Sequence, residues 1–171
     1  MAVDPQSLSL VFHPADVLKE VAKTVDPEDK NVHAVAQAMI QIMREHRGAG
    51  LAAPQVGLSW RLFVTHDPDN QEHAFAWINP TLETVGNNTA IEDEGCLSIP
   101  EVRGNIRRPV SIRITGFDIQ GNPAEEMSDD MIARVWQHEN DHLDGVLIID
   151  KMNAMDRLVN RRKIRDLERA I

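Results

Sequence analysis

Apolar residues in the first third of the chain recur three and four positions apart. They are Val32, Val35, Ala36, Met39, Ile40 and Met43. This spacing predicts an amphipathic helix with one buried face. Asp26-Pro27 is typical of a helix start and Gly48 of a helix end, so we expect the helix to span about residues 27–47.

Alternation of apolar and polar residues predicts strands farther along. Val110, Ile112 and Ile114 alternate with polar residues and indicate a half-buried strand. Residues 61–65 and 73–78 are expected to be short strands, and residues 118–122 a turn into another pairing segment. Turns are expected at Asn79-Pro80 and at Gly-Asn-Asn, residues 86–88.

Helical spacing returns from Met131 to Leu143, with Ser128 as the expected N-cap. A terminal helix is expected over residues 157–169, with Leu158 among its inward-facing residues. Separated strands and few helices favour an α+β fold, in which mainly antiparallel sheets pack around the central helix, with N-terminal and C-terminal helices beside them. The length of 171 residues predicts a single domain, residues 1–171.

The composition excludes several classes of protein. With 18 Lys+Arg and 27 Asp+Glu, the net charge is −9, which argues against nucleic-acid specificity and against binding to anionic membranes. No apolar run reaches the roughly 18 residues of a membrane span, and the N-terminus lacks the pattern of a secretory signal. The basic run Arg161-Arg162-Lys163 is therefore interpreted first as a solvated helix face.

The strongest chemical signal is His138-Glu139-Asn140-Asp141-His142. Two histidines four residues apart on a helix project from one face and can converge on one cation, while the glutamate between them can act as a general base. The alternative is a surface helix with two solvated histidines, which the apolar residues of the same helix disfavour. A catalytic metal site needs a third ligand, and the pattern alone leaves His, Asp, Glu and Cys open.

Two further features are ambiguous when taken alone. Cys96 is the single cysteine, so it forms no internal disulfide, and by itself it is interpreted as a buried small side chain. Residues 48–57 hold three glycines and a proline and predict an irregular loop that can approach a ligand closely. The Gln55 amide can donate to an oxyanion there, although a plain connecting loop is the simpler interpretation.

Three motifs in this order resemble those of the peptide deformylase family. They are Gly48-Ala49-Gly50-Leu51-Ala52-Ala53-Pro54-Gln55, Glu94-Gly95-Cys96-Leu97-Ser98 and Gln137-His138-Glu139-Asn140-Asp141-His142. The resemblance, over about residues 10–150, implies that Cys96 is the third metal ligand beside His138 and His142, which overturns the interpretation of a structural cysteine. It implies one divalent metal ion, Fe2+ in cells, with Zn2+, Ni2+ or Co2+ able to take its place. The ligand types alone favour zinc.

The activity that the resemblance implies is hydrolytic removal of the N-formyl group from the formylmethionine of newly made polypeptides, with release of formate. Glu139 and the metal ion would together generate hydroxide. The oxyanion would be held by the metal ion, the Gln55 amide and the backbone N–H of Leu97. Gly50 would offer backbone hydrogen bonds to an extended peptide that adds to a strand edge.

The methionine side chain of the substrate requires an apolar pocket. We expect Val135, Met131 and Leu97 to line it, with the stem of Arg134 at the rim and its charge in solvent. Ala49 occupies a family position that often holds a larger branched residue, so a wider pocket mouth is expected. An ion pair between Glu94 and Arg103 is expected to fix the cysteine loop.

The expected partners are N-formylmethionyl nascent peptides, with a transient ribosome contact through Arg161-Arg162-Lys163. We expect a monomer without membrane attachment in the bacterial cytoplasm, with an organellar origin as the alternative. Two other functions compete with a deformylase. A metalloprotease that cuts internal peptide bonds is disfavoured by the cysteine and the glycine loop, and a non-catalytic metal or peptide binder by the complete set of implied catalytic residues.

Overall fold

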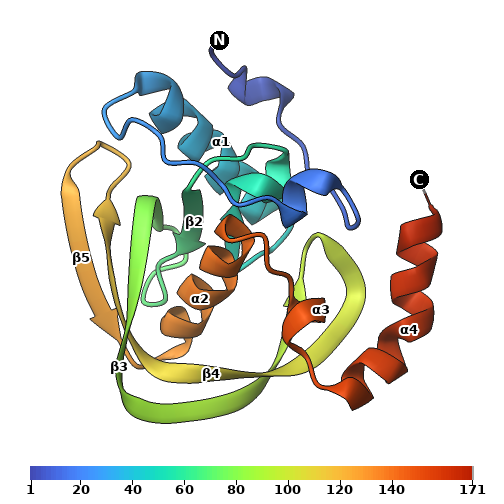
Figure 1. Ribbon diagram of the computed structural model, residues 1–171. Helices are drawn as coiled ribbons and strands as arrows, with labels where there is room; N and C mark the ends of the chain where they lie inside the picture. The colour runs from blue at the N-terminus through green and yellow to red at the C-terminus, as the bar shows by residue number, and fades with distance from the viewer. Residues whose placement is uncertain (171) are drawn as a thin grey trace.

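Residues 1–170, which the computed structural model describes, contain a five-stranded antiparallel sheet in the order β1-β2-β3-β4-β5 (Figure 1). The strands are β1 Gly50–Ala52, β2 Leu62–His66, β3 Ala74–Cys96, β4 Ile99–Phe117 and β5 Pro123–Ser128. The helices are η1 Pro5–Ser7, η2 Asp16–Lys19, α1 Lys30–Glu45, η3 Ala53–Val56, α2 Met131–Leu143, α3 Ile148–Lys151 and α4 Ala154–Arg169. The expected α+β fold around a central helix, α2, is confirmed.

Strand β2 separates two parts of the core. Its successive side chains point to opposite faces of the sheet, so Leu62 and Val64 pack with the buried face of α1, while Phe63 packs with α2. On the α2 side, Trp136 meets Trp77 of β3 edge to face, with 6.1 Å between the ring centroids. Because both faces of β2 are buried, α1 is held on one side of the sheet and α2 on the other.

The long β3–β4 hairpin curves around α2 and carries a tight turn at its tip (Figure 1). Cys96 pairs with Ile99, so Leu97 and Ser98 form the turn itself. Apolar residues of β4 such as Val102 and Ile106 pack with α3 and with the inward face of α4. This packing holds the tip of the hairpin, and with it Cys96, beside α2.

Two expected turns are instead irregularities within one continuous strand. Residues 73–78 begin β3, but the strand does not end at Asn79-Pro80 or at residues 86–88. Asn79 and Gly86 adopt positive φ angles of 51° and 75°, and the register with β4 shifts there. These residues therefore form β-bulges, which bend the hairpin without ending it.

Helix boundaries also differ from the expectations. The N-cap of α1 is Asp29, not Asp26, because the Asp29 carboxylate accepts the backbone N–H of Asn31 at 2.8 Å. Ser128 belongs to β5, and Asp130 occupies the N-cap position of α2.

The expectation that Leu158 faces inward is wrong. Its side chain is 62% exposed, because α4 packs against the hairpin through the face that carries Asn160, Ile164 and Leu167. No helix within residues 1–170 combines the length and the apolar character that crossing a membrane requires.

Candidate metal centre and active site

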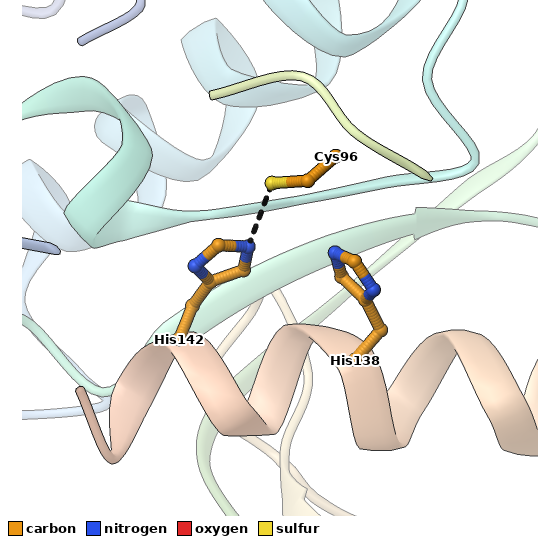
Figure 2. A group of neighbouring side chains, drawn as sticks. All are labelled: Cys96, His138 and His142. Carbon is orange, nitrogen blue, oxygen red and sulfur yellow. Dashed lines mark hydrogen bonds between the residues drawn. The ribbon is translucent and has the colours of Figure 1, made fainter. Parts of the chain in front are cut away.

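Helix α2 and the tip of the β3–β4 hairpin bring Cys96, His138 and His142 together (Figure 2). The two histidines stand one helical turn apart, with 5.2 Å between their ring centroids. One ligand atom from each of the three residues lies within 4.8 Å of the others, and Cys96 Sγ is 3.4 Å from His142 Nε2. One thiol and two imidazoles suit a divalent transition metal and leave a fourth position open to water or substrate.

Glu94 orients one of these histidines. Its Oε1 atom is 2.9 Å from His138 Nδ1. An ionised carboxylate only accepts hydrogen bonds, so the neutral form of His138 carries its proton on Nδ1 and its lone pair on Nε2. This is the tautomer that a metal ion requires.

The charges around the ligands favour a cation. Burial lowers the pKa of His138, but hydrogen bonds with Cys96 and Glu94 and the charge of Glu139 outweigh it and raise that pKa to about 10. An environment that stabilises a proton on His138 also stabilises a metal cation. Burial moves the pKa of His142 well below its usual value, so this imidazole stays neutral and can act as a ligand.

A buried network fixes Glu94 in turn. Arg108, which is 2% exposed, donates to both carboxylate oxygens of Glu94, at 2.7 and 2.9 Å, and to Asp141 at 2.8 Å. Arg134 donates to Glu94 Oε2 at 2.7 Å. Burial alone raises the pKa of Glu94, but hydrogen bonds from Arg108, His138 and Arg134 hold it well below its usual range. Glu94 is therefore a permanently ionised acceptor for His138.

Glu139 lies between the ligands and strand β1. It is 4% exposed, and its Oε2 atom has no hydrogen-bond partner within the described chain. Burial raises the pKa of Glu139 to about 7, although the charges of His138 and Arg108 oppose this. A carboxylate that changes protonation near neutral pH and has a free oxygen can accept and return a proton.

Gln55 presents its amide N–H2 to the same centre. Its Oε1 atom accepts the backbone N–H of Ala52 at 2.9 Å, which fixes the orientation of the amide. Nε2 then lies 3.2 Å from Ser98 Oγ and 3.6 Å from Cys96 Sγ. A donor fixed in this way can stabilise negative charge that develops beside the cysteine.

A cavity of about 520 Å3 opens onto these groups. Nine of the ten residues singled out from the sequence line it: Gly50, Gln55, Cys96, Leu97, Met131, Arg134, Val135, His138 and Glu139. His142, the tenth, is 1% exposed and lies behind the cavity wall. Met131 is 62% exposed and stands at the rim.

The expectation that the charge of Arg134 meets solvent is wrong. The residue is 9% exposed, and its guanidinium also donates to the backbone oxygens of Ala90 and Ile106, at 2.9 and 3.0 Å. The expected ion pair between Glu94 and Arg103 is wrong as well. Arg103 pairs with Asp93 at 2.6 Å, because alternation along β4 turns its side chain to the exposed face.

Arg108 is the residue that sequence reasoning missed. Alternation along β4 places it on the same buried face as Val102 and Ile106. The pattern thus contained a signal, since an arginine on an apolar face requires a buried acidic partner.

Comparisons with known proteins agree with this geometry. The sequence model described as "Polypeptide deformylase" matches residues 7–158. A peptide deformylase of Thermotoga petrophila is 41% identical and covers 91% of this chain and 93% of its own length. A peptide deformylase of Rhodopirellula baltica is 37% identical and covers 94% of this chain and 77% of its own.

Solved structures show the same likeness. A peptide deformylase structure from Plasmodium falciparum superposes with a TM-score of 0.88 at 34% identity, over 94% of this chain and 95% of that one. A plant peptide deformylase structure gives a TM-score of 0.87 at 34% identity, over 94% and 89%. The chain belongs to the peptide deformylase family, metal-dependent hydrolases that remove the N-formyl group from newly made polypeptides.

Proposed function

We propose that Cys96, His138 and His142 hold the divalent ion of this enzyme and that Glu139 is its general base. The observation that carries the proposal is the convergence of three ligand atoms within 4.8 Å, beside a buried carboxylate with one unpartnered oxygen. When bound, the ion supplies a Lewis acid that polarises the formyl group and lowers the pKa of water.

The protein's own groups then guide the proton and the developing charge. Glu139 accepts a proton from the attacking water through its free oxygen, and returns it to the amine that leaves. The Gln55 amide and the backbone N–H of Leu97 donate to the oxyanion that forms on the formyl carbon. The hydrogen bond from the backbone N–H of Ala52 fixes the Gln55 amide before the substrate arrives, which reduces the reorganisation needed in the transition state.

The substrate peptide is proposed to add to the free edge of β1. This strand is at the end of the sheet, and Gly50 lies on it beside Glu139. Val135 and Leu97 would contact the methionine side chain, with Met131 at the rim. The role of Arg134 is proposed to be limited to its stem, which forms part of the wall, while its charge stabilises Glu94.

Iron(II) is the proposed metal in cells, and Zn2+, Ni2+ and Co2+ are expected to occupy the same ligands. A thiolate beside a ferrous ion is sensitive to oxygen, since both the iron and the sulfur can be oxidised. Metal analysis of protein purified without oxygen tests this choice.

The remaining proposals concern the surroundings of the enzyme. We propose a single domain over residues 1–171, a monomer, and a place in the bacterial cytoplasm, where formylated chains are made; an organelle is the alternative. A transient ribosome contact is proposed through Arg161-Arg162-Lys163, because Arg161 and Arg162 are exposed on α4.

The test of the proposed function is formate release from formyl-Met-Ala-Ser by iron-loaded protein under anaerobic conditions. Stoichiometric formate and free Met-Ala-Ser are expected. If no formate appears from protein that carries one metal ion per chain, the chain is a binder without catalysis. Cleavage of an unformylated protein substrate would indicate a metalloprotease instead.

A further inference from the structure

A second cavity adjoins the one at the metal ligands. It has a volume of about 640 Å3 and lies between the end of α1, the segment that follows β2, and the start of α2. The two cavities share five lining residues: Arg47, Gly48, Ala49, Met131 and Val135. One of the shared residues, Ala49, carries only a methyl group, so no long side chain at that residue blocks a peptide that extends from one cavity towards the other.

The second cavity carries positive charge in a protein whose net charge is −9. Two arginines, Arg44 and Arg47, line it against one carboxylate, Asp67. Arg44 donates to the backbone oxygen of Glu72 at 2.6 Å, which holds one guanidinium at the wall. His66 Nδ1 is buried and has no hydrogen-bond partner within residues 1–170. Arg47 lines both cavities and is the cationic residue that they share.

The direction of the substrate follows from the order of residues along β1. Gln55 and the metal ligands lie beyond the carboxyl end of this strand, so the formyl group is bound there. The rest of the peptide then runs antiparallel to β1, from Gly50 past Ala49 and Gly48 towards Arg47. Side chains of an extended peptide alternate between two faces, so the first and third residues point the same way, about 7 Å apart.

The residues that line both cavities indicate which face of the extended peptide the second cavity receives. Met131 and Val135 line the pocket proposed for the methionine side chain, and they line the second cavity as well. The third residue of the substrate therefore points into the second cavity, while the second residue points away from it.

We propose that the second cavity is a subsite for the third residue of the formylated chain, and that it favours aspartate or glutamate there. The inference rests on the proposed function and adds a substrate class to it. The charges that would attract the acidic side chain are partly exposed to solvent. The expected preference for an acidic third residue is therefore about twofold to fivefold in kcat/KM.

The experiment compares kcat/KM of the metal-loaded enzyme for peptides with amidated C-termini, so that no terminal carboxylate imitates the acidic side chain. Formyl-Met-Ala-Asp-amide is compared with formyl-Met-Ala-Asn-amide, and formyl-Met-Asp-Ala-amide with formyl-Met-Asn-Ala-amide. The Asp/Asn ratio is expected to exceed one only at the third position. It is expected to fall towards one at about 0.5 M salt, which screens exposed charges.

Variants assign the preference to the cavity. Arg47→Ala is expected to bring the third-position ratio towards one, and Ala49→Ile to lower it by narrowing the junction. Arg169→Ala, at the far end of α4 and outside both cavities, removes the same charge and is expected to keep the ratio of the unmodified enzyme.

An Asp/Asn ratio of kcat/KM equal to one at the third position, measured at low salt, overturns the proposed subsite. A preference for Asp at the second position alone overturns it too. So does a third-position ratio that Arg47→Ala leaves unchanged. Absence of turnover with every peptide contradicts the proposed function instead. In that case calorimetric binding of Met-Ala-Asp-amide and Met-Ala-Asn-amide to the metal-loaded protein tests the subsite separately.

Discussion

Glu139 lies directly against Gly50, so closely that a Cβ atom at residue 50 would be 2.7 Å from Oε1 and 2.8 Å from Cγ of the glutamate. The glycine is needed because the carboxylate occupies the space of a side chain. We therefore expect Gly50→Ala to displace Glu139 and to lower kcat about 10- to 100-fold, as small misplacements of catalytic groups do. Steady-state deformylation of formyl-Met-Ala-Ser measures this, with metal content unchanged.

Gly86→Ala is the matched control for that variant. A Cβ atom at residue 86 would meet nothing within 4 Å, but the residue has a positive φ angle of 75°. The backbone strain is expected to cost roughly 1 kcal/mol of stability without changing kcat. Equal losses of kcat in the two variants would show that the Gly50 effect is not a displacement of Glu139.

Replacement of the proposed base separates chemistry from metal binding. Glu139→Gln keeps the shape of the side chain but cannot accept the proton, so kcat is expected to fall about 100- to 10,000-fold. The metal content is expected to stay near that of the unmodified enzyme, since Glu139 is not among the proposed ligands. Near-normal deformylation by this variant would mean that another group is the base.

Removal of the thiolate is expected to remove the metal. Cys96→Ser places a hydroxyl, a poor ligand for a soft divalent ion, where the sulfur lies 3.4 Å from His142 Nε2. We expect metal content and activity to be lost together. Chelation should lower the Tm of the unmodified protein, because an ion bound only to the folded state stabilises it, and should leave the Tm of Cys96→Ser unchanged. His46 is exposed and lines neither cavity, so His46→Ala is the control for loss of an imidazole.

Strand β4 offers a matched pair of arginines that tests the buried network. Arg108 is 2% exposed and joins Glu94 to Asp141, whereas the side chain of Arg103 is 62% exposed and pairs with Asp93. Arg108→Met leaves two carboxylates short of a partner in the interior, and we expect it to lower the free energy of unfolding by about 3–5 kcal/mol. Arg103→Met is expected to cost at most about 1 kcal/mol. Urea denaturation measures both, and similar losses would contradict the role assigned to burial.

Local patterns predicted most elements but not their ends or irregularities. The periodicity of α1 and α2 identified both helices, because a buried face must repeat at 3.6 residues. Local patterns could not distinguish a turn from a bulge at Asn79 and Gly86, since Asn and Gly are tolerant of positive φ angles and suit either structure. Only the pairing of β3 with β4 decides whether the chain reverses or continues there.

The ten candidate site residues came from motifs, and nine of them line one cavity. The pattern His-Glu-x-x-His needed only helical geometry to bring two imidazoles together. Cys96 was different, because no local rule joins a hairpin turn to a helix that lies more than 40 residues away; the resemblance to a family assigned it, and the packing of the hairpin against α2, α3 and α4 brings it there.

By itself the sequence determined the class of chemistry, through residue types whose spacing along one helix already fixes their mutual geometry. The tertiary structure decided which charges meet. Glu94 forms ion pairs with Arg108 and Arg134, which are 14 and 40 residues away in the sequence, and not with Arg103. Strand alternation and helix packing determine which of these arginines reach it. Burial could be predicted from the pattern of apolar positions, but the partner of a buried charge depends on register between distant segments, which no local pattern encodes.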